Sequence, residues 1–367
     1  MRTIPSLIRF LWLAVALVAG PVAAASEALD ASIARATAFM VDVAQGDDGS
    51  FAPQVGPAVT ALAVTSLVES GSACDHEAVR MGLEYLLTFR QADGGIHAPD
   101  SPVANYETSI ALVALAACNT DGRHDEVIAA AERFVKGLQW DDGEKTGPDD
   151  PAYGGAGYGR KKRPDLSNTS FFVEALQSIG RGPDDPAIKR ALVFVLRTQN
   201  LEGPDNPLPV AAKNPDGGFY YTPAAGGESQ AGATPDGGLR SYSSMTYAGL
   251  KSMIFAGLTK EDARVQAALR WLQRHYTFEE NPGLGDSGLY YYYQAAAKAL
   301  EAFGEDTFTD KSGVAHDWRE ELSAAIVKRQ QPDGSWVNDN ARWMEGDPAI
   351  VTSYALMALS RCRRPAN

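Results

Sequence analysis

A glycine-bearing turn phrase recurs along this chain, each time between two apolar runs. Its most complete copy spans residues 330–336, which read Gln-Gln-Pro-Asp-Gly-Ser-Trp, and shorter copies occupy residues 45–51, 91–96 and 215–219. Two looser copies, at residues 139–155 and 282–290, bring the chain to six units of roughly 45 to 75 residues. A repeat of this period predicts an architecture in which each unit packs on its neighbours.

Each unit contains two helical patterns of different character. The patterns ahead of the turns have apolar positions three and four apart, which indicates amphipathic helices at residues 79–89, 129–138, 188–196, 265–272 and 318–327. The patterns behind the turns are apolar almost all round, at residues 59–68, 108–117, 169–179, 246–256, 295–303 and 351–359. Because a helix without a polar face must be buried, the sequence predicts an all-α fold, an (α/α)6 barrel or toroid of six helix pairs. The Asp-Gly pairs suit its turns, since glycine adopts positive φ freely and Asp can bond the following backbone.

The first 25 residues have the pattern of a secretory signal peptide. Arg2 and Arg9 form the charged start, and residues 10–20 form a short apolar core. Ala23 and Ala25 allow cleavage before Ser26. We therefore expect an exported protein, periplasmic or extracellular, with residues 26–367 as one toroid domain. No later run is long enough to span a bilayer. The Pro- and Gly-rich residues 203–238 are expected to form an elaborated loop inside the fourth unit, and such loops are often functional.

Charge and cysteine content narrow the possible partners. The net charge of -13 argues against nucleic acid and against an anionic membrane surface. Cys74, Cys118 and Cys362 each follow a buried helix, in units that are consecutive around a closed ring. If a disulfide forms, Cys74 is the expected member, with Cys118 or Cys362 as its partner; three free buried thiols are the alternative. No Cys or His pair has metal-ligand spacing, so we expect neither a metal nor another cofactor.

The most complete turn phrase carries a family resemblance. Residues 329–336 resemble the QW repeat of squalene-hopene and oxidosqualene cyclases, and the whole chain resembles the squalene cyclase and prenyltransferase repeat superfamily. Those cyclases carry a DxDDT-type acidic motif at the start of an inner helix. In residues 164–169 this chain keeps the first acid as Asp165 but has Ser167 and Asn168 at the other two acidic positions. An alcohol and an amide cannot protonate an alkene, so the resemblance does not extend to protonation-initiated squalene cyclisation.

Two other classes of enzyme, protein prenyltransferases and polysaccharide lyases, use the same toroid fold. Protein prenyltransferases hold zinc with Asp, Cys and His, whereas the comparable residues 236–245 contain no Cys. Polysaccharide lyases use a base, often Arg or Lys, and the basic run 160–163 directly precedes Asp165. A solvated basic loop is the favoured explanation of that run, because four adjacent cations rarely all face a cavity.

The candidate site residues lie in the loops before the buried helices, where a toroid opens onto its axis. Asp165 and Glu107 are the candidate catalytic residues. The candidate cavity residues are polar or aromatic: Tyr106, Tyr153, Tyr158, Asn168, Arg240, Tyr242, Ser244, Tyr290, Tyr291, Arg342, Trp343, Glu345 and Asp347. Asp347, before Pro348, is also typical of a helix start. Of the four tyrosines at 290–293, only one or two can face the axis, because consecutive helical residues are about 100° apart.

Acidic and aromatic residues together suit either an isoprenoid or a stacked sugar ring. We therefore expect an exported protein that binds or transforms a hydrophobic isoprenoid-type molecule in its axial cavity, and whose enzymatic activity, if any, is terpenoid cyclase-like. A catalytically silent binding or scaffold protein of the envelope and a carbohydrate-active, polysaccharide lyase-like toroid are the alternatives. Buried carboxylates around a cavity would favour an enzyme, whereas a filled axis would favour the scaffold.

Overall fold

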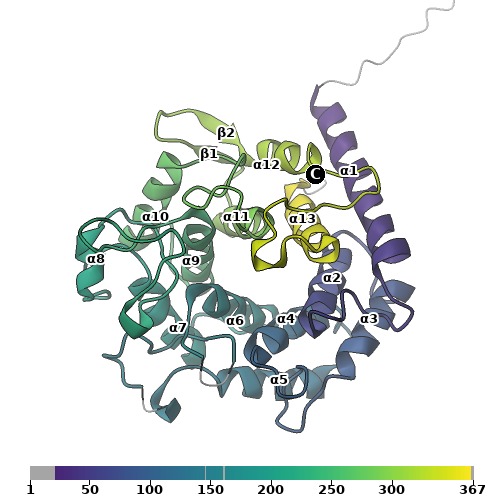
Figure 1. The fold of residues 1–367 in the computed structure, drawn as a ribbon, viewed down its shortest axis with the longest axis horizontal. Coiled ribbons are helices and arrows are strands. Elements are labelled where there is room, and N and C mark those ends of the chain that lie inside the picture. Colours follow the sequence, from purple (N-terminus) through teal and green to yellow (C-terminus); the bar gives the residue numbers. More distant parts are fainter. Residues whose placement is uncertain (1–20, 145, 160–161, 365–367) are drawn as a thin grey trace, which may run out of the picture.

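Six outer helices and six inner helices alternate along the chain and form a closed double ring (Figure 1). The computed structural model describes residues 21–144, 146–159 and 162–364. The inner helices are α2 (Pro57–Glu69), α4 (Ala104–Ala117), α6 (Leu166–Ser178), α9 (Ser243–Phe255), α11 (Leu289–Phe303) and α13 (Pro348–Cys362). The outer helices are α1 (Pro21–Phe39), α3 (Glu77–Leu87), α5 (Asp125–Lys136), α7 (Pro186–Arg197), α10 (Ala263–Arg274) and α12 (Trp318–Val327). The predicted all-α toroid is confirmed.

Helix α1 is the sixth outer helix, which the sequence patterns did not locate. It packs against α12 and α13, and α13 packs against α2, so contacts between neighbouring helices run around the whole ring. Residues 1–20 of the expected signal peptide lie outside the described residues, and α1 continues through the expected cleavage point before Ser26. None of the described helices is both long enough and apolar enough to cross a membrane.

Shorter elements decorate the ring. A π-helix, η1 (Met40–Ala44), extends α1, and a small antiparallel hairpin of β1 (Thr307–Thr309) and β2 (Ala315–Asp317) precedes α12. The predicted long loop of the fourth unit holds only the short helix α8 (Pro209–Lys213) and the 3₁₀ turn η3 (Ala224–Gly226). Two further 3₁₀ turns are η2 (Asp142–Glu144) and η4 (Arg342–Met344).

A glutamine at the turn ties several units to the next outer helix. Gln139 Nε2 donates to the carbonyl of Gly154 in its own turn at 2.8 Å and to the carbonyl of Ala187, at the start of the next outer helix, at 2.9 Å. Gln330 makes the corresponding pair with Gly334 and Ser32, both at 2.9 Å. Ser32 lies on α1, so the hydrogen bond from Gln330 joins the last unit to the first helix and closes the ring.

The turn glycines allow the same close approach. A Cβ on Gly154 would lie 1.9 Å from the Arg190 carbonyl oxygen on α7, and one on Gly334 would lie 2.5 Å from that of Arg35 on α1. Both glycines have positive φ, so a side chain is excluded by space and by backbone conformation. The repeated Asp-Gly phrase is therefore a joint between neighbouring outer helices, as its structural interpretation predicted.

Toward their C-terminal ends the inner helices carry a group of mostly buried charges, which we call the ion-pair cluster. It comprises Glu69, Glu174, Lys251, Lys298, Glu301 and Arg361. Burial opposes ionisation of Glu174, but the neighbouring Lys251 and Lys298 outweigh that effect and lower the pKa of its carboxyl. Arg361 binds Glu69 at 2.7 Å and Glu301 at 3.2 Å. The cluster joins α2, α6, α9, α11 and α13 at this end of the ring.

The cysteines lie at the same end of the inner helices. Cys74 and Cys118 form a disulfide with a Cα–Cα distance of 5.5 Å, which confirms Cys74 as the bonded residue and selects Cys118 as its partner. Cys362, the last residue of α13, is a buried free thiol, and burial raises its pKa to about 12. The disulfide links the segment after α2 to the end of α4.

Candidate functional site

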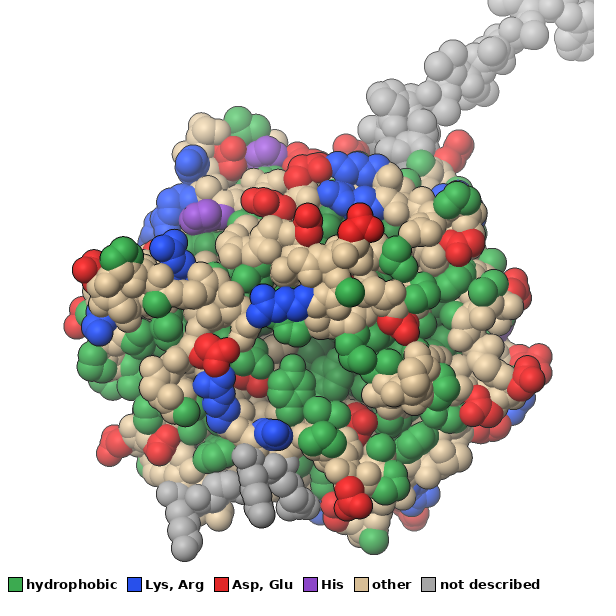
Figure 2. All heavy atoms as spheres, viewed as in Figure 1, with side chains coloured by type: hydrophobic (Ala, Val, Ile, Leu, Met, Phe, Trp, Pro, Cys, Tyr) green, Lys and Arg blue, Asp and Glu red, His purple; other side chains and the backbone are tan. Residues whose placement is uncertain are grey.

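A cavity of about 410 Å³ opens at the other end of the ring, where all six inner helices begin. Figure 2 shows the corresponding hollow at the centre of this face, with hydrophobic side chains inside it and charged side chains around it. We call this the cavity end, and the opposite end, with the ion-pair cluster, the ion-pair end. The axis is therefore not filled by side chains at the cavity end.

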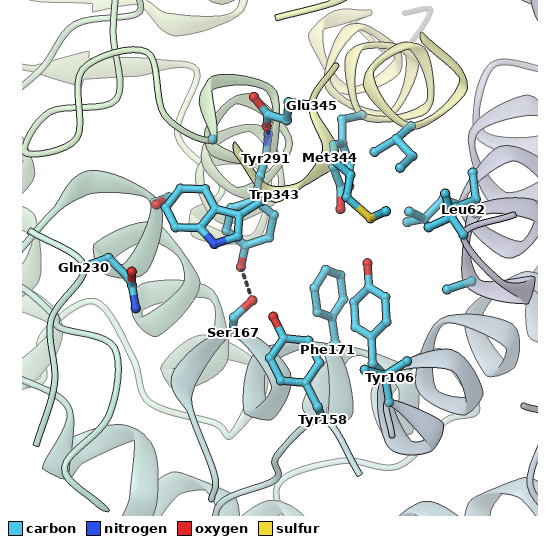
Figure 3. Close-up of a pocket in the computed structure, with 18 of the residues that line it drawn as sticks. Leu62, Tyr106, Tyr158, Ser167, Phe171, Gln230, Tyr291, Trp343, Met344 and Glu345 are labelled. Carbon is cyan, nitrogen blue, oxygen red and sulfur yellow. Dashed lines mark hydrogen bonds between the residues drawn. The ribbon is translucent and has the colours of Figure 1, made fainter. Parts of the chain in front are cut away.

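One wall of the cavity is an arc of aromatic rings from four inner helices and one loop (Figure 3). Tyr106 contacts Tyr158 with ring centroids 6.0 Å apart and meets Phe171 edge-on at 5.4 Å. Phe171 and Tyr354 each lie 6.1 Å from Tyr291. Such tilted and edge-on contacts are favourable for aromatic pairs, so the arc is a packed wall.

The opposite wall is aliphatic and comes from α2, its preceding loop and α13. It consists of Val55, Ala58, Val59, Leu62 and Ile350. These residues are branched or small, and they have no polar side-chain atoms to offer a ligand. The cavity thus has a hydroxyl-bearing aromatic side and a side that can contact only apolar groups.

Two loops complete the rim. The long loop of the fourth unit contributes Tyr221 and Gln230, and the loop before α13 contributes Trp343, Met344 and Glu345. Trp343 and Met344 have φ of 55° and 66° and are 44% and 51% exposed. Positive φ is costly for large side chains, and exposure of apolar ones is unfavourable, so this loop gains nothing in stability from its conformation.

Two carboxylates line the cavity. Glu107 Oε2 accepts the Ala98 amide at 3.2 Å, and Gly56 leaves room for its Oε1, because a Cβ there would lie 2.8 Å from that oxygen. Glu345 Oε1 accepts the Tyr291 amide at 2.8 Å and so caps the start of α11. Burial raises the pKa of both carboxyls. They are weaker acids than exposed glutamates, the reverse of what alkene protonation requires.

Asp165 does not line the cavity. It is the N-cap of α6, where Oδ1 accepts the Asn168 amide at 2.9 Å and Oδ2 accepts the Asn168 side-chain amide at 2.8 Å. Burial raises the pKa of the Asp165 carboxyl to about 6. The Tyr221 hydroxyl interacts with that carboxyl, and Tyr221 itself lines the cavity.

The other sequence candidates divide between cavity and scaffold. Those that line the cavity are Tyr106, Glu107, Tyr158, Tyr242, Ser244, Tyr291, Trp343 and Glu345. Those absent from its described lining are Tyr153, Asp165, Asn168, Arg240, Tyr290, Arg342 and Asp347. Of the tyrosine run 290–293, only Tyr291 is among the lining residues.

Most candidates outside the lining have structural partners. Asp347 caps α13 by accepting the Ala349 amide at 2.9 Å, and Tyr290 is buried against Tyr293. Arg240 is exposed and donates to the Ala233 carbonyl at 3.0 Å. Arg342 lies at the rim, where its guanidinium stacks 4.1 Å from the Trp343 ring.

Several lining residues were missed by the sequence analysis. They include Phe171, Tyr221, Gln230, Met245, Met344 and Tyr354. Phe171 and Tyr354 lie in the second turn of their inner helices, whereas the candidates from the sequence lie mainly in the loops and first turns. The sequence feature that could have identified them is an aromatic residue one turn inside an apolar helix.

The described residues contain no group of three or more His, Cys, Asp or Glu side chains placed to hold a metal ion. The polar groups of the cavity are instead hydroxyls, carboxyls and one amide. The arrangement can bury an apolar molecule and offer it hydrogen bonds.

Comparison with known families decides the relationship. The model of the squalene-hopene cyclase C-terminal domain matches residues 27–209. The chain belongs to the squalene cyclase-like superfamily. A search of curated proteins gave no significant match.

Several solved structures are similar to this chain in fold. A protein from Actinoplanes is 17% identical, with 91% of this chain and 99% of that chain covered and a TM-score of 0.53. A polysaccharide lyase is 11% identical, with coverages of 92% and 97% and a TM-score of 0.52. A type II terpene cyclase, MstE from Scytonema, is 15% identical, with coverages of 92% and 98%, but its TM-score of 0.35 supports no inference. At these identities the likeness concerns the fold alone.

Proposed function

We propose that this superfamily member binds a hydrophobic isoprenoid-type molecule in its axial cavity. The observation that carries the proposal is the cavity of about 410 Å³, whose lining is dominated by aromatic and aliphatic side chains. Its volume lies within the usual range for small-molecule sites, and an apolar lining favours burial of hydrocarbon. A scaffold protein without a ligand has no need of such a space.

Binding has more support than a cyclase reaction. The Asp165 carboxylate is engaged as a helix cap, and the cavity carboxyls of Glu107 and Glu345 have raised pKa values. None of them combines access to the cavity with unusual acidity. Any chemistry at this site would use a substrate more basic than an alkene.

A glycan ligand has less support. Anionic polysaccharides need cationic partners, and no Lys, Arg or His is among the described residues that line the cavity. The aliphatic wall on α2 also offers nothing to the hydroxyl groups of a sugar.

A cavity-filling substitution tests the proposal. Ala58 lies on α2 and faces the cavity, so Ala58→Phe should place a ring inside it. We expect at least a tenfold loss of affinity for farnesene and farnesol in tryptophan fluorescence titrations, with little change in stability because the space is empty. The matched control is Ala263→Phe, which puts the same ring on the exposed first turn of α10.

Farnesene and farnesol that fail to bind the folded wild-type protein would refute the proposal. Equal affinity of wild-type and Ala58→Phe proteins would place the ligand outside the cavity. Mass spectrometry of each ligand after incubation separates binding from conversion, and we expect it to recover the ligand unchanged.

A further inference from the structure

Six tyrosines line the cavity, and they come from α4, α11, α13 and the loops before α6 and α9, but not from α2. They are Tyr106, Tyr158, Tyr221, Tyr242, Tyr291 and Tyr354. Their hydroxyls are close enough to influence one another: Tyr106 interacts with Tyr354, and Tyr158 with Tyr221. A cavity that binds only hydrocarbon needs no hydroxyls, because each hydroxyl loses solvation on burial.

Most of these hydroxyls have protein partners. Tyr291 shares a hydrogen bond of 3.0 Å with Ser167, drawn in Figure 3, and Tyr221 interacts with Asp165. The hydroxyl of Tyr242 has neither a hydrogen bond nor a tyrosine or carboxyl partner of this kind within the described part of the chain, although the residue is 98% buried. A buried hydroxyl that lines a cavity without a protein partner is available to a ligand.

The rest of the lining constrains the charge of that ligand. Within the described lining, the ionisable groups other than tyrosines are Glu107 and Glu345, with no Lys, Arg or His. Arg342, at the rim, is occupied by Trp343 and by Gln230, to which it donates at 2.6 Å. A phosphate or diphosphate buried here would meet carboxyls rather than cations, at a large cost in desolvation.

Resting on the proposed function, we infer that the natural ligand is a neutral, unphosphorylated amphiphile with a hydroxyl at one end. The hydroxyl lies beside Tyr242 and the tyrosine side of the cavity. The hydrocarbon chain lies along the aliphatic wall of Val55, Ala58, Val59 and Leu62. This polarity matches the two chemically different sides of one cavity.

Three probes with the same hydrocarbon chain test the inference: farnesene, farnesol and farnesyl diphosphate. We expect farnesol to bind about three- to tenfold more tightly than farnesene, the gain of one buried hydrogen bond. Farnesyl diphosphate should bind at least tenfold more weakly than farnesol. Isothermal titration of the whole chain measures all three.

A paired substitution locates the hydroxyl. Tyr242→Phe should remove the advantage of farnesol and leave the affinity for farnesene unchanged. Tyr247→Phe is the control, because Tyr247 is equally buried on the same helix but is absent from the described lining. It should leave the affinities for both probes unchanged.

The outcomes separate this inference from the proposed function. Binding of farnesyl diphosphate as tight as that of farnesol would overturn the inference and leave the proposed function standing. So would an equal loss of farnesene and farnesol affinity in Tyr242→Phe. A folded wild-type protein that binds none of the three probes would overturn both.

Discussion

The two ends of the inner ring bury polar groups in opposite ways. At the ion-pair end, Glu174 has Lys251 and Lys298 as buried partners. At the cavity end, Tyr242 keeps a hydroxyl without a protein partner in the described chain, beside an empty volume. The same helices therefore hold the fold at one end and leave hydrogen-bonding capacity at the other.

The largest effect should follow from breaking the ion-pair cluster. Glu174→Gln leaves Lys251 and Lys298 buried without their shared counter-ion, and we expect unfolding to become easier by about 3–5 kcal/mol. Urea denaturation measures the loss, while ligand affinity of the folded protein should not change. The triple variant Glu174→Leu, Lys251→Met, Lys298→Met removes all three charges and should recover most of the stability. A loss below about 1 kcal/mol in Glu174→Gln would contradict the assigned role.

The disulfide at the same end should have the next largest effect. Cys74 and Cys118 are 44 residues apart in sequence, and their bond restricts the unfolded chain, so Cys74→Ser with Cys118→Ser should cost about 2–4 kcal/mol. Denaturation with and without reductant measures it. Cys362→Ser serves as the comparison: it keeps the Cys74–Cys118 bond, so it should show the same dependence on reductant as the wild-type protein. An equal effect of reductant on the wild-type protein and on the double variant would show that this bond does not form.

Asp165, at the start of α6, should make the stability depend on pH. Its pKa is raised from 3.8 to about 6 in the folded state, so between pH 4 and pH 6 the folded protein keeps a proton that the unfolded chain releases. The carboxyl thus lowers stability as pH rises through this window, by up to about 3 kcal/mol. Asp165→Asn keeps the cap without titrating, so relative to wild type it should gain stability from pH 4 to pH 7. A difference that is constant with pH would contradict the raised pKa.

The smallest effect on stability is expected at the rim of the cavity. Trp343→Gly relieves a positive φ and removes an exposed ring, so the free energy of unfolding should change by no more than about 1 kcal/mol. Its affinity for farnesol should nevertheless fall, because Trp343 lines the cavity. Val314→Gly, at an exposed position outside the described cavity lining, should leave the affinity unchanged. A large loss of stability in Trp343→Gly would mean that the rim also supports the fold.

The sequence predicted the fold well because the joints between units require particular residues. Only glycine fits where Gly154 and Gly334 meet a neighbouring helix, and only a long amide reaches both carbonyls that Gln139 and Gln330 bind. These requirements recur at several turns and are visible as a repeat. Helix α1 escaped detection because its sequence is rich in alanine and begins within the expected signal peptide.

The site was less predictable for a physical reason. An inner helix is apolar on every face, so its sequence does not show that Phe171 or Tyr354 faces the axis rather than a neighbouring helix. Tyr221 comes from the long loop, whose path depends on contacts such as the hydrogen bond from the Leu166 amide to its carbonyl. Asp165 was correctly placed at the head of an inner helix, but its orientation away from the cavity depends on packing.

The hydrogen bonds of Gln330 join the last unit of the chain to α1, so the first and last parts of the sequence are neighbours in the ring. The joint that closes the ring uses the same contact as the joint at Gln139 between consecutive units. Arg363, just after α13, binds Asp30 on α1 at 2.9 Å, which places these two parts of the chain side by side. A circular permutant, joined there by a short linker and opened at another exposed turn, should therefore fold into the same toroid with the same cavity.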